Sequence, residues 1–455
     1  MATPPVFSVI IATYNWSSAL RLALRSVLGQ TFGDFEVLVV GDGCTDDSAD
    51  VVRSMGDPRV QWHNLPRNHG SQWAPNNHGL SQARGKYVAY LGHDDLWWPT
   101  HLAQAFDVLE HGGADIAAAA TLMYGPEDSG IRALSGFFPN DRFSLRHFFV
   151  PSSMAHRLEI ARAVGGWRPP EEAILAVDVD FLRRCHDAGA RVVATKDVTT
   201  FKFNAAWRRD AYLTKDPHQQ REFMEQAARL GEAFRLRELT RALEAASQDK
   251  LIKIEVPTDA KASATISSNI NHQFKGSRKT QRLQAFTLVQ GRRRYPPNPD
   301  YAGFEWHGLE NDRKRGAFRW SGPCTQSHIV LPERMAGPSE LRLQLVHHIS
   351  TDVLRSLRVT ANDVTVDMVM TPQEDGTLIL HGCIPADAGQ QPDSNELRLA
   401  LTVSRTWRPI DLRHSDDRRW LGVAVGWTEI GPWPPEPSQP KPSRGTWWKF
   451  LRSAE

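Results

Sequence analysis

Two adjacent carboxylates, Asp94 and Asp95, follow directly after an apolar strand predicted at residues 86–91. Acidic side chains at the end of a buried strand are costly unless a partner compensates their charge. Magnesium or manganese is one such partner, because these hard cations prefer oxygen ligands and often bind one or two carboxylates together with substrate phosphates. The pair therefore predicts a divalent-cation site that carries a diphosphate. The alternative is an acidic turn that caps the helix predicted to begin after Pro99.

Polar loops follow two further apolar runs. Thr13, Tyr14 and Asn15 come after a β-branched run near the N-terminus, and Asp42 follows the next apolar run in a glycine-flanked loop. Helical patterns separate the runs, and this alternation of strand and helix predicts a doubly wound, mostly parallel α/β sheet. Ligands of such sheets bind beyond the carboxyl ends of the strands. We therefore expect these residues to lie beside Asp94 in one site.

The overall composition excludes some classes of protein. The chain has 455 residues and a formal net charge of +2, which is too balanced to predict nucleic-acid binding by bulk electrostatics. Its four cysteines lack the spacing of a zinc site, and we expect free thiols in a reducing compartment. The sequence contains no leader-like segment and no apolar run of about 20 residues, so we expect a cytoplasmic protein with at most a peripheral contact at the inner face of the membrane.

A series of short motifs runs through residues 1–213. They are Val9-Ile10-Ile11-Ala12-Thr13-Tyr14-Asn15, Gly41-Asp42-Gly43-Cys44-Thr45-Asp46, Asn77-His78-Gly79-Leu80, Ala83-Arg84-Gly85-Lys86-Tyr87-Val88-Ala89-Tyr90-Leu91, Asp94-Asp95-Leu96-Trp97, Gly165-Gly166-Trp167 and Val177-Asp178-Val179-Asp180-Phe181. In type, order and spacing the series resembles a family 2 glycosyltransferase with the GT-A fold. Each motif is short, and the resemblance rests on their shared order.

The resemblance implies a metal-assisted glycosyltransferase that uses a nucleotide-diphosphate sugar, with a UDP-sugar expected as the donor and Mg²⁺ or Mn²⁺ as the cofactor. It implies donor contacts from Thr13, Tyr14, Asn15, Asp42, Asn77 and Asp94, and metal contacts from Asp94 and Asp95. By their chemistry, Tyr14 can stack on the base, Thr13 can reach the ribose, and Asp42 can accept a hydrogen bond from a base N–H group. The alternatives are a packed Tyr14 and a turn-forming Asp42.

Asp178 is the predicted general base. In an inverting transfer a carboxylate removes the proton of the acceptor hydroxyl while that oxygen attacks the anomeric carbon. Asp178 and Asp180 also begin a predicted helix, where acidic side chains are favoured by the helix dipole, so a purely structural role is the alternative for both.

Several positions depart from the family's pattern. The second loop reads Gly41-Asp42-Gly43-Cys44, Gly92 stands where the metal motif usually has an acid, and Val177 stands where an acid usually precedes the catalytic aspartate. Many relatives also carry a histidine in a late loop as an extra metal ligand. None occurs between residues 192 and 212, so we expect Lys202 or Asn204 to replace it.

The pattern changes after the first domain. Residues 214–250 have helical spacing and are predicted to brace or link the domain, whereas residues 251–432 contain alternating segments separated by turns, which predict an antiparallel β-sandwich of accessory type. Residues 433–455 form a proline-rich tail that we expect to be disordered.

Together these features predict an inverting glycosyltransferase that acts on a glycan or lipid-linked glycan in cell-envelope polysaccharide biosynthesis. A second hypothesis is a carbohydrate-binding protein with a degenerate N-terminal domain and a lectin-like sandwich. A third hypothesis is a nucleotidyltransferase. Such an enzyme would need a loop rich in glycine and lysine over the phosphates, and the loop from Thr13 to Trp16 is not rich in these residues.

Overall fold

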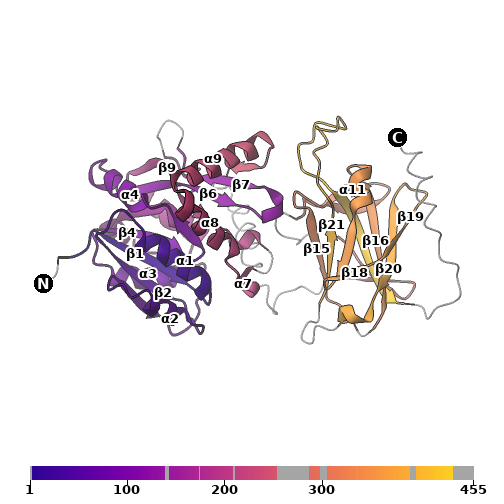
Figure 1. Cartoon of the computed structure of the whole chain (residues 1–455), viewed down its shortest axis with the longest axis horizontal. Helices are drawn as coiled ribbons and strands as arrows, with labels where there is room; N and C mark the ends of the chain where they lie inside the picture. The colour runs from indigo at the N-terminus through magenta and orange to yellow at the C-terminus, as the bar shows by residue number, and fades with distance from the viewer. Residues whose placement is uncertain are drawn as a thin grey trace. The chain divides into compact units, whose positions relative to one another are not determined.

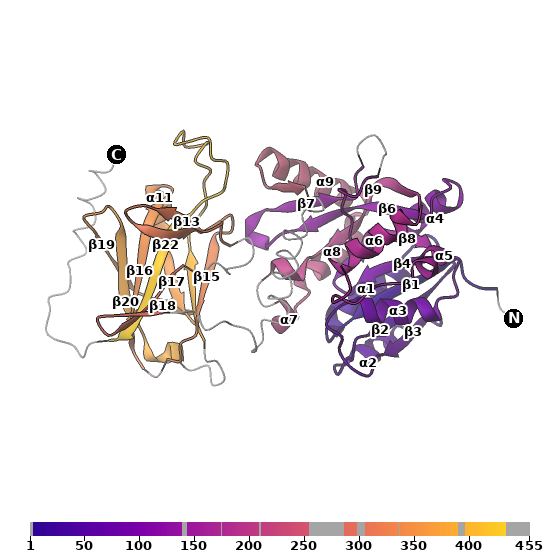
Figure 2. The same cartoon turned by 180° about the vertical axis from the view of Figure 1, so that it is seen from behind.

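In a computed structural model the chain forms two compact units, Met1–Phe274 and Lys275–Glu455 (Figure 1, Figure 2). The structure describes residues 3–138, 143–173, 175–208, 211–253, 286–297, 305–335, 337–389 and 396–433. Of the predicted tail, residues 434–455 lie outside the described residues.

The first unit is built on a ten-stranded sheet with the order β10-β7-β6-β8-β4-β1-β2-β3, and β9 pairs with β5 and β6. Its strands are β1 Phe7–Thr13, β2 Phe35–Gly41, β3 Val60–Asn64, β4 Tyr87–Gly92, β5 Asp95–Trp97, β6 Ile116–Tyr124, β7 Arg132–Ser135, β8 Met154–Arg157, β9 Val192–Lys202 and β10 Leu251–Lys253. Strands β4, β1, β2 and β3 are parallel, whereas β8 is antiparallel to both β4 and β6. The predicted α/β fold is confirmed, with a sheet that is mixed beyond β4.

Helices cover both faces of this sheet. They are α1 Ser17–Leu28, α2 Ser48–Ser54, α3 Trp73–Gln82, α4 His101–Glu110, α5 Leu158–Ala163, α6 Val177–Asp187, α7 Ala211–Thr214, α8 His218–Leu230 and α9 Glu232–Ser247, with 3₁₀ turns η1 Glu127–Ser129, η3 Pro151–Ser153 and η4 Ala205–Trp207. Side chains alternate along β1, so that Val9 and Ile11 pack with α1, α2 and α4, while Ile10 packs with α3, α5 and α6. A strand buried on both sides reads as a continuous apolar run, as it does here. Within the described residues, we find no helix whose length and apolar character would let it cross a bilayer.

The helical segment after the first domain belongs to the same unit. Phe223 of α8 and Phe234 of α9 pack on Leu96 and Phe201, so the predicted brace is part of the core of this unit. Strand β10 corrects one boundary, because Leu251–Lys253 pairs in parallel with β7 and does not open the sandwich. A short alternating strand can pair with any open sheet edge, and its sequence does not say which.

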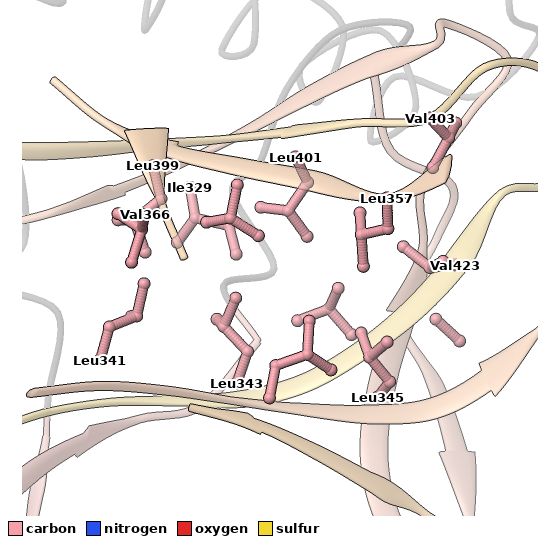
Figure 3. Packing of buried hydrophobic residues seen from close by; sticks show 14 of the residues in the cluster. Ile329, Leu341, Leu343, Leu345, Leu357, Val366, Leu399, Leu401, Val403 and Val423 are labelled. Atoms are coloured by element: carbon pink, nitrogen blue, oxygen red, sulfur yellow. The ribbon is translucent and has the colours of Figure 1, made fainter. Parts of the chain in front are cut away.

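The second unit is an antiparallel β-sandwich, as predicted. One sheet has the order β11-β12-β22-β16-β20-β19, with β14 on β22 and β13 on β14, and the other has the order β15-β21-β17-β18. Figure 3 shows Leu341, Leu343 and Leu345 of β16 facing Ile329 and Leu399 across the core between the sheets. The elements are β11 Thr287–Val289, β12 Arg292–Tyr295, β13 Glu310–Asp312, β14 Gly316–Trp320, β15 Gln326–Leu331, β16 Ser339–His348, α11 Thr351–Ser356, β17 Arg358–Ala361, β18 Val364–Val366, β19 Met368–Pro372, β20 Leu378–Ile384, η5 Ala386–Gly389, β21 Leu397–Thr402 and β22 Val423–Pro432.

Two buried histidines of the first unit predict its response to acid. Burial lowers the pKa of His101, which stacks on Trp97, to about 3, and lowers the pKa of His156 to about 4. Below the ordinary histidine pKa of about 6.5 the unfolded chain gains protons that the native state does not bind, so the free energy of unfolding falls as the pH falls. Each histidine should contribute a loss of about 2 kcal/mol between pH 7 and pH 5.

Denaturant unfolding of the full chain at several pH values measures this loss in the transition of the first unit. The variant His101→Gln lacks one of the titrating groups, so its free energy of unfolding should fall by about 2 kcal/mol less than that of the unsubstituted protein over the same pH range. Equal pH dependence in the two proteins would contradict the assignment.

Candidate active site

The loops that carry the predicted site residues begin side by side. Thr13 at the end of β1 is in register with Gly41 at the end of β2, and Ala12 is in register with Gly92 at the end of β4. The parallel register therefore brings all of these loops to one edge of the sheet, as the sequence predicts.

Tyr14 presents an open aromatic ring at this edge. Its side chain is 43% exposed, whereas the neighbouring Thr13 is buried. The backbone N–H of Tyr14 lies 3.3 Å from Nδ1 of His93, and the Thr13 hydroxyl lies 2.9 Å from the same nitrogen. Burial lowers the pKa of His93, so this histidine is a neutral acceptor that fixes the backbone below the Tyr14 ring.

Asn15 joins the first two loops. It adopts a left-handed backbone conformation with φ of 46°, and its side-chain oxygen accepts hydrogen bonds from the N–H groups of Thr45, at 2.7 Å, and Asp46, at 3.2 Å. Asp46 in turn accepts from the N–H groups of Ser17 and Ser48, and so caps the starts of both α1 and α2. Asn15 thus holds the loops together, and its predicted donor contact stays a prediction.

Asp42 anchors a further loop. One of its oxygens accepts from the N–H groups of His69, at 2.9 Å, and Gly70, at 3.2 Å, and the other lies 2.9 Å from Nδ1 of His69. Gly43 permits the close approach, since a Cβ there would lie 2.5 Å from the backbone of Arg67 and its φ of +72° disfavours other residues. The predicted contact of Asp42 with a base stays a prediction, beside this structural role.

Asn77 is likewise engaged. Its side-chain amide donates to the carbonyl of Trp167, and its side-chain oxygen accepts from the N–H group of Trp167, each at 2.8 Å. Trp167 itself stacks on Phe181 in the core and does not line the site. Both polar ends of Asn77 therefore fix a turn, and its predicted donor contact is not tested.

Asp95 forms a buried ion pair with Lys202. The strands β5 and β9 are antiparallel with Asp95 opposite Lys202, and cross-strand partners have side chains within reach of each other. Nζ of Lys202 lies 2.9 Å and 3.2 Å from the two oxygens of Asp95, whose side chain is fully buried. The Ser152 hydroxyl also donates to Asp95 and accepts from the N–H group of Gly92 at 3.0 Å.

The electrostatics of this pair keep Lys202 positively charged. Burial raises the pKa of Asp95 to about 6, and Lys202 and Ser152 act against that rise. Burial lowers the pKa of Lys202, but the carboxylates of Asp95, Asp94 and Asp178 outweigh it, so its pKa lies above the ordinary value. At neutral pH the site therefore holds a partly buried ammonium.

Asp94 has the freer carboxylate of the two. Its backbone carbonyl accepts from Gln220 at 3.1 Å, but its side chain has no hydrogen bond or ion pair with another described residue. Gly92 lies between both carboxylates, because a Cβ at this position would be 3.1 Å from Asp94 and 3.0 Å from Asp95. An acidic side chain in place of Gly92 would have to share this confined space.

Asp178 lies in the first turn of α6, where it faces the same charges. Oδ1 of Asp178 accepts from the N–H group of Val179 at 2.9 Å. Burial raises the pKa of Asp178, while the Lys202 charge acts to lower it. Asp180, in contrast, forms an ion pair with Arg184 at 2.8 Å, so its role is structural. Within the described part of the chain, Asp178 has no ion-pair partner.

Comparison with known proteins identifies this unit. Residues 8–163 match the family model Glycosyl transferase family 2. The chain is 31% identical over 105 residues to an uncharacterized glycosyltransferase of Rickettsia typhi, covering 23% of this chain and 32% of that protein.

Residues 8–163 form a glycosyltransferase family 2 domain.

Two relatives of this family 2 domain have names that state what they do. Over 103 residues the chain is 31% identical to a UDP-Glc:α-D-GlcNAc-diphosphoundecaprenol β-1,3-glucosyltransferase of Escherichia coli, and over 113 residues it is 34% identical to a succinoglycan biosynthesis protein of Rhizobium meliloti. These alignments cover 23% and 25% of this chain, and 41% and 32% of those proteins. The chain thus spans less than half the length of each.

Among solved structures, S. aureus TarS 1–349 is similar to 64% of this chain, covering 96% of TarS 1–349, with 19% identity and a TM-score of 0.37. At this TM-score the likeness adds nothing to the family assignment.

Asp95 does not offer a free carboxylate to the divalent cation expected between Asp94 and Asp95, because both of its oxygens accept hydrogen bonds from the Lys202 ammonium. The predicted metal role of Asp95 stays a prediction beside this ion pair. Among the described residues no cluster of three or more histidine, cysteine, aspartate or glutamate side chains is arranged to hold a metal ion. The Lys202 ammonium supplies the positive charge beside Asp95.

Proposed function

We propose that the family 2 domain transfers a sugar, with inversion, from a nucleotide-diphosphate sugar to a glycan or lipid-linked glycan, and that the donor is a UDP-sugar. One observation carries the proposal. Tyr14, with its exposed aromatic ring, and Asp94 follow parallel strands that end at one edge of the sheet, and the ammonium of Lys202 interacts with the charges of Asp94 and Asp178. These groups offer a stacking surface for a base, a positive charge for a diphosphate and a base for an acceptor hydroxyl.

In the proposed reaction Asp178 accepts the proton of the acceptor hydroxyl. That oxygen forms a bond to the anomeric carbon from the side opposite the leaving group, which inverts the configuration. The bond from the anomeric carbon to the diphosphate breaks, and its electron pair stays with the diphosphate. The raised pKa of Asp178 suits a base, because catalysis is most effective when the pKa lies closer to the working pH.

The names of two relatives support a role in polysaccharide assembly. One is named for glucosyl transfer to a diphosphoundecaprenol-linked sugar and the other for succinoglycan biosynthesis. An acceptor of this class, at the inner face of the membrane, is therefore part of the proposal. Asp94 and Asp178 have no ion-pair partner among the described residues, which favours the transferase over the alternative of a degenerate carbohydrate-binding protein.

Tyr14→Ala tests the donor site. Stacking of a base on an aromatic side chain contributes about 1–3 kcal/mol by alanine substitution, so UDP should bind about 10- to 100-fold more weakly to Tyr14→Ala. Tyr14→Phe keeps the ring and should bind UDP within about twofold of the unsubstituted protein. Isothermal titration with UDP measures both. Equal affinity of Tyr14→Ala and the unsubstituted protein would exclude stacking on Tyr14.

A further inference from the structure

We propose that Lys202 takes the place of the divalent cation in the first unit: its ammonium meets the diphosphate of the donor, so that nucleotide binding and sugar transfer do not require a metal ion. The inference rests on the proposed function and concerns the same edge of the sheet. It starts from the mismatch between the expected metal pair and the observed ion pair of Asp95 with Lys202.

One N–H donor of the Lys202 ammonium is not used by the described residues. An ammonium group has three N–H donors. The described residues take two of them, through the two oxygens of Asp95 at 2.9 Å and 3.2 Å. The third donor remains for a ligand. Asp95 is held from the other side by Ser152, so the ammonium is fixed before any ligand arrives. Preorganised donors of this kind stabilise charge without the cost of reorganisation.

A second cation near the carboxylates, Arg208, does not have this freedom. The guanidinium of Arg208 donates to the carbonyl of Asn204 at 3.0 Å, to the carbonyl of Gly125 at 3.1 Å and to Gln219 at 2.9 Å. It therefore holds the loop around η4 in place. Lys202, in contrast, interacts with the charges of three carboxylates, and each of them raises its pKa. They are Asp95, Asp94 and Asp178, of which the last two are proposed to meet the donor and the acceptor.

Charge balance is satisfied without a metal. When the bond from the anomeric carbon to the β-phosphate oxygen breaks, that oxygen keeps the electron pair and gains a negative charge. The acceptor proton moves to Asp178, which loses its negative charge. Lys202 stays protonated throughout and donates its third hydrogen to the diphosphate, so the increase in negative charge arises beside a fixed positive one.

The experiment compares UDP with uridine as titrants, in EDTA and in manganese, for the full chain. We expect UDP to bind at least about 10-fold more tightly than uridine in EDTA, because the charged hydrogen bond from Lys202 is made only to the diphosphate. Manganese should change the affinity for UDP by less than about threefold. Lys202→Met should lower the affinity for UDP in EDTA by about 10- to 100-fold and leave uridine binding unchanged.

Two further proteins keep the test interpretable. Lys202→Met leaves Asp95 buried without its partner, so the double variant Asp95→Asn with Lys202→Met, which removes both charges, should fold and show the same loss for UDP. Lys86→Met is the matched control, because Lys86, just before β4, forms a solvent-exposed ion pair with Glu110, and this variant should bind UDP normally.

The outcomes separate this inference from the proposed function. Binding of UDP that requires manganese and is unaffected by Lys202→Met would overturn the inference and leave the proposed function standing. Failure of UDP and of GDP and dTDP, tested in the same way, to bind in either buffer would overturn both.

Discussion

Asp178→Asn is expected to lower kcat by about 10³-fold, because the amide cannot accept the proton of the acceptor hydroxyl. The affinity for UDP should stay within about twofold, since Asp178 is proposed to face the acceptor and makes its hydrogen bond to the neighbouring Val179. Initial rates of transfer at saturating donor, together with titration of UDP, measure the two effects separately.

Asp180→Asn is the matched control for this result. Asp180 lies two residues further along α6 and pairs with Arg184, so its loss should reduce stability and leave the chemical step nearly intact. The pH profile adds a second test. Because burial raises the pKa of Asp178, kcat should fall as the pH drops through that raised pKa, and the residual rate of Asp178→Asn should lack this dependence. Full turnover by Asp178→Asn would show that another group is the base.

Asp95→Ala is expected to destabilise the first unit by about 3–5 kcal/mol, because it leaves the Lys202 ammonium buried without its partner. Asp95 is fully buried, and both of its oxygens bind Lys202. Replacing Lys202 by Met in the same protein removes the stranded charge, so the double variant should recover most of the lost stability. Denaturant unfolding of the single and double variants gives the coupling between the two residues.

The exposed ion pair between Lys86 and Glu110 provides the contrast. Solvent screens it, so Lys86→Met should leave the stability nearly unchanged. If Asp95→Ala behaved like Lys86→Met, the ion pair of Asp95 with Lys202 would not be present in solution, and the argument that Lys202 replaces a metal would lose its basis.

Patterns of apolar residues were enough to predict both units of the fold. The run that became β1 is apolar at every position because Val9 and Ile11 face one layer of helices and Ile10 faces the other. The same reasoning placed Tyr14, Asp42 and Asp94 at one edge of the sheet, since parallel strands that follow one another along the chain end together. The periodicity of apolar side chains was thus enough to predict the helix layers on both faces of the sheet and the sheet edge that carries the polar loops.

The partners of the polar residues could not be predicted in this way. Ser152 and Lys202 reach Asp95 from segments distant in sequence, through η3 and through the register of β5 with β9. No local spacing encodes that register. His93 stands beside Asp94 in the motif, but its bonds to Thr13 and Tyr14 depend on how β1 and β4 align. A missing histidine in the late loop was the one signal in the sequence that pointed to Lys202.

Release of nucleotide from UDP-, GDP- and dTDP-sugars by the purified full chain, with EDTA and with manganese, decides whether the gathered loops form an active transferase. We predict that at least one donor is turned over, that the rate persists in EDTA, and that Asp178→Asn lowers the rate of transfer to an added acceptor by about 10³-fold. If no nucleotide sugar is consumed in either buffer, these loops do not catalyse glycosyl transfer.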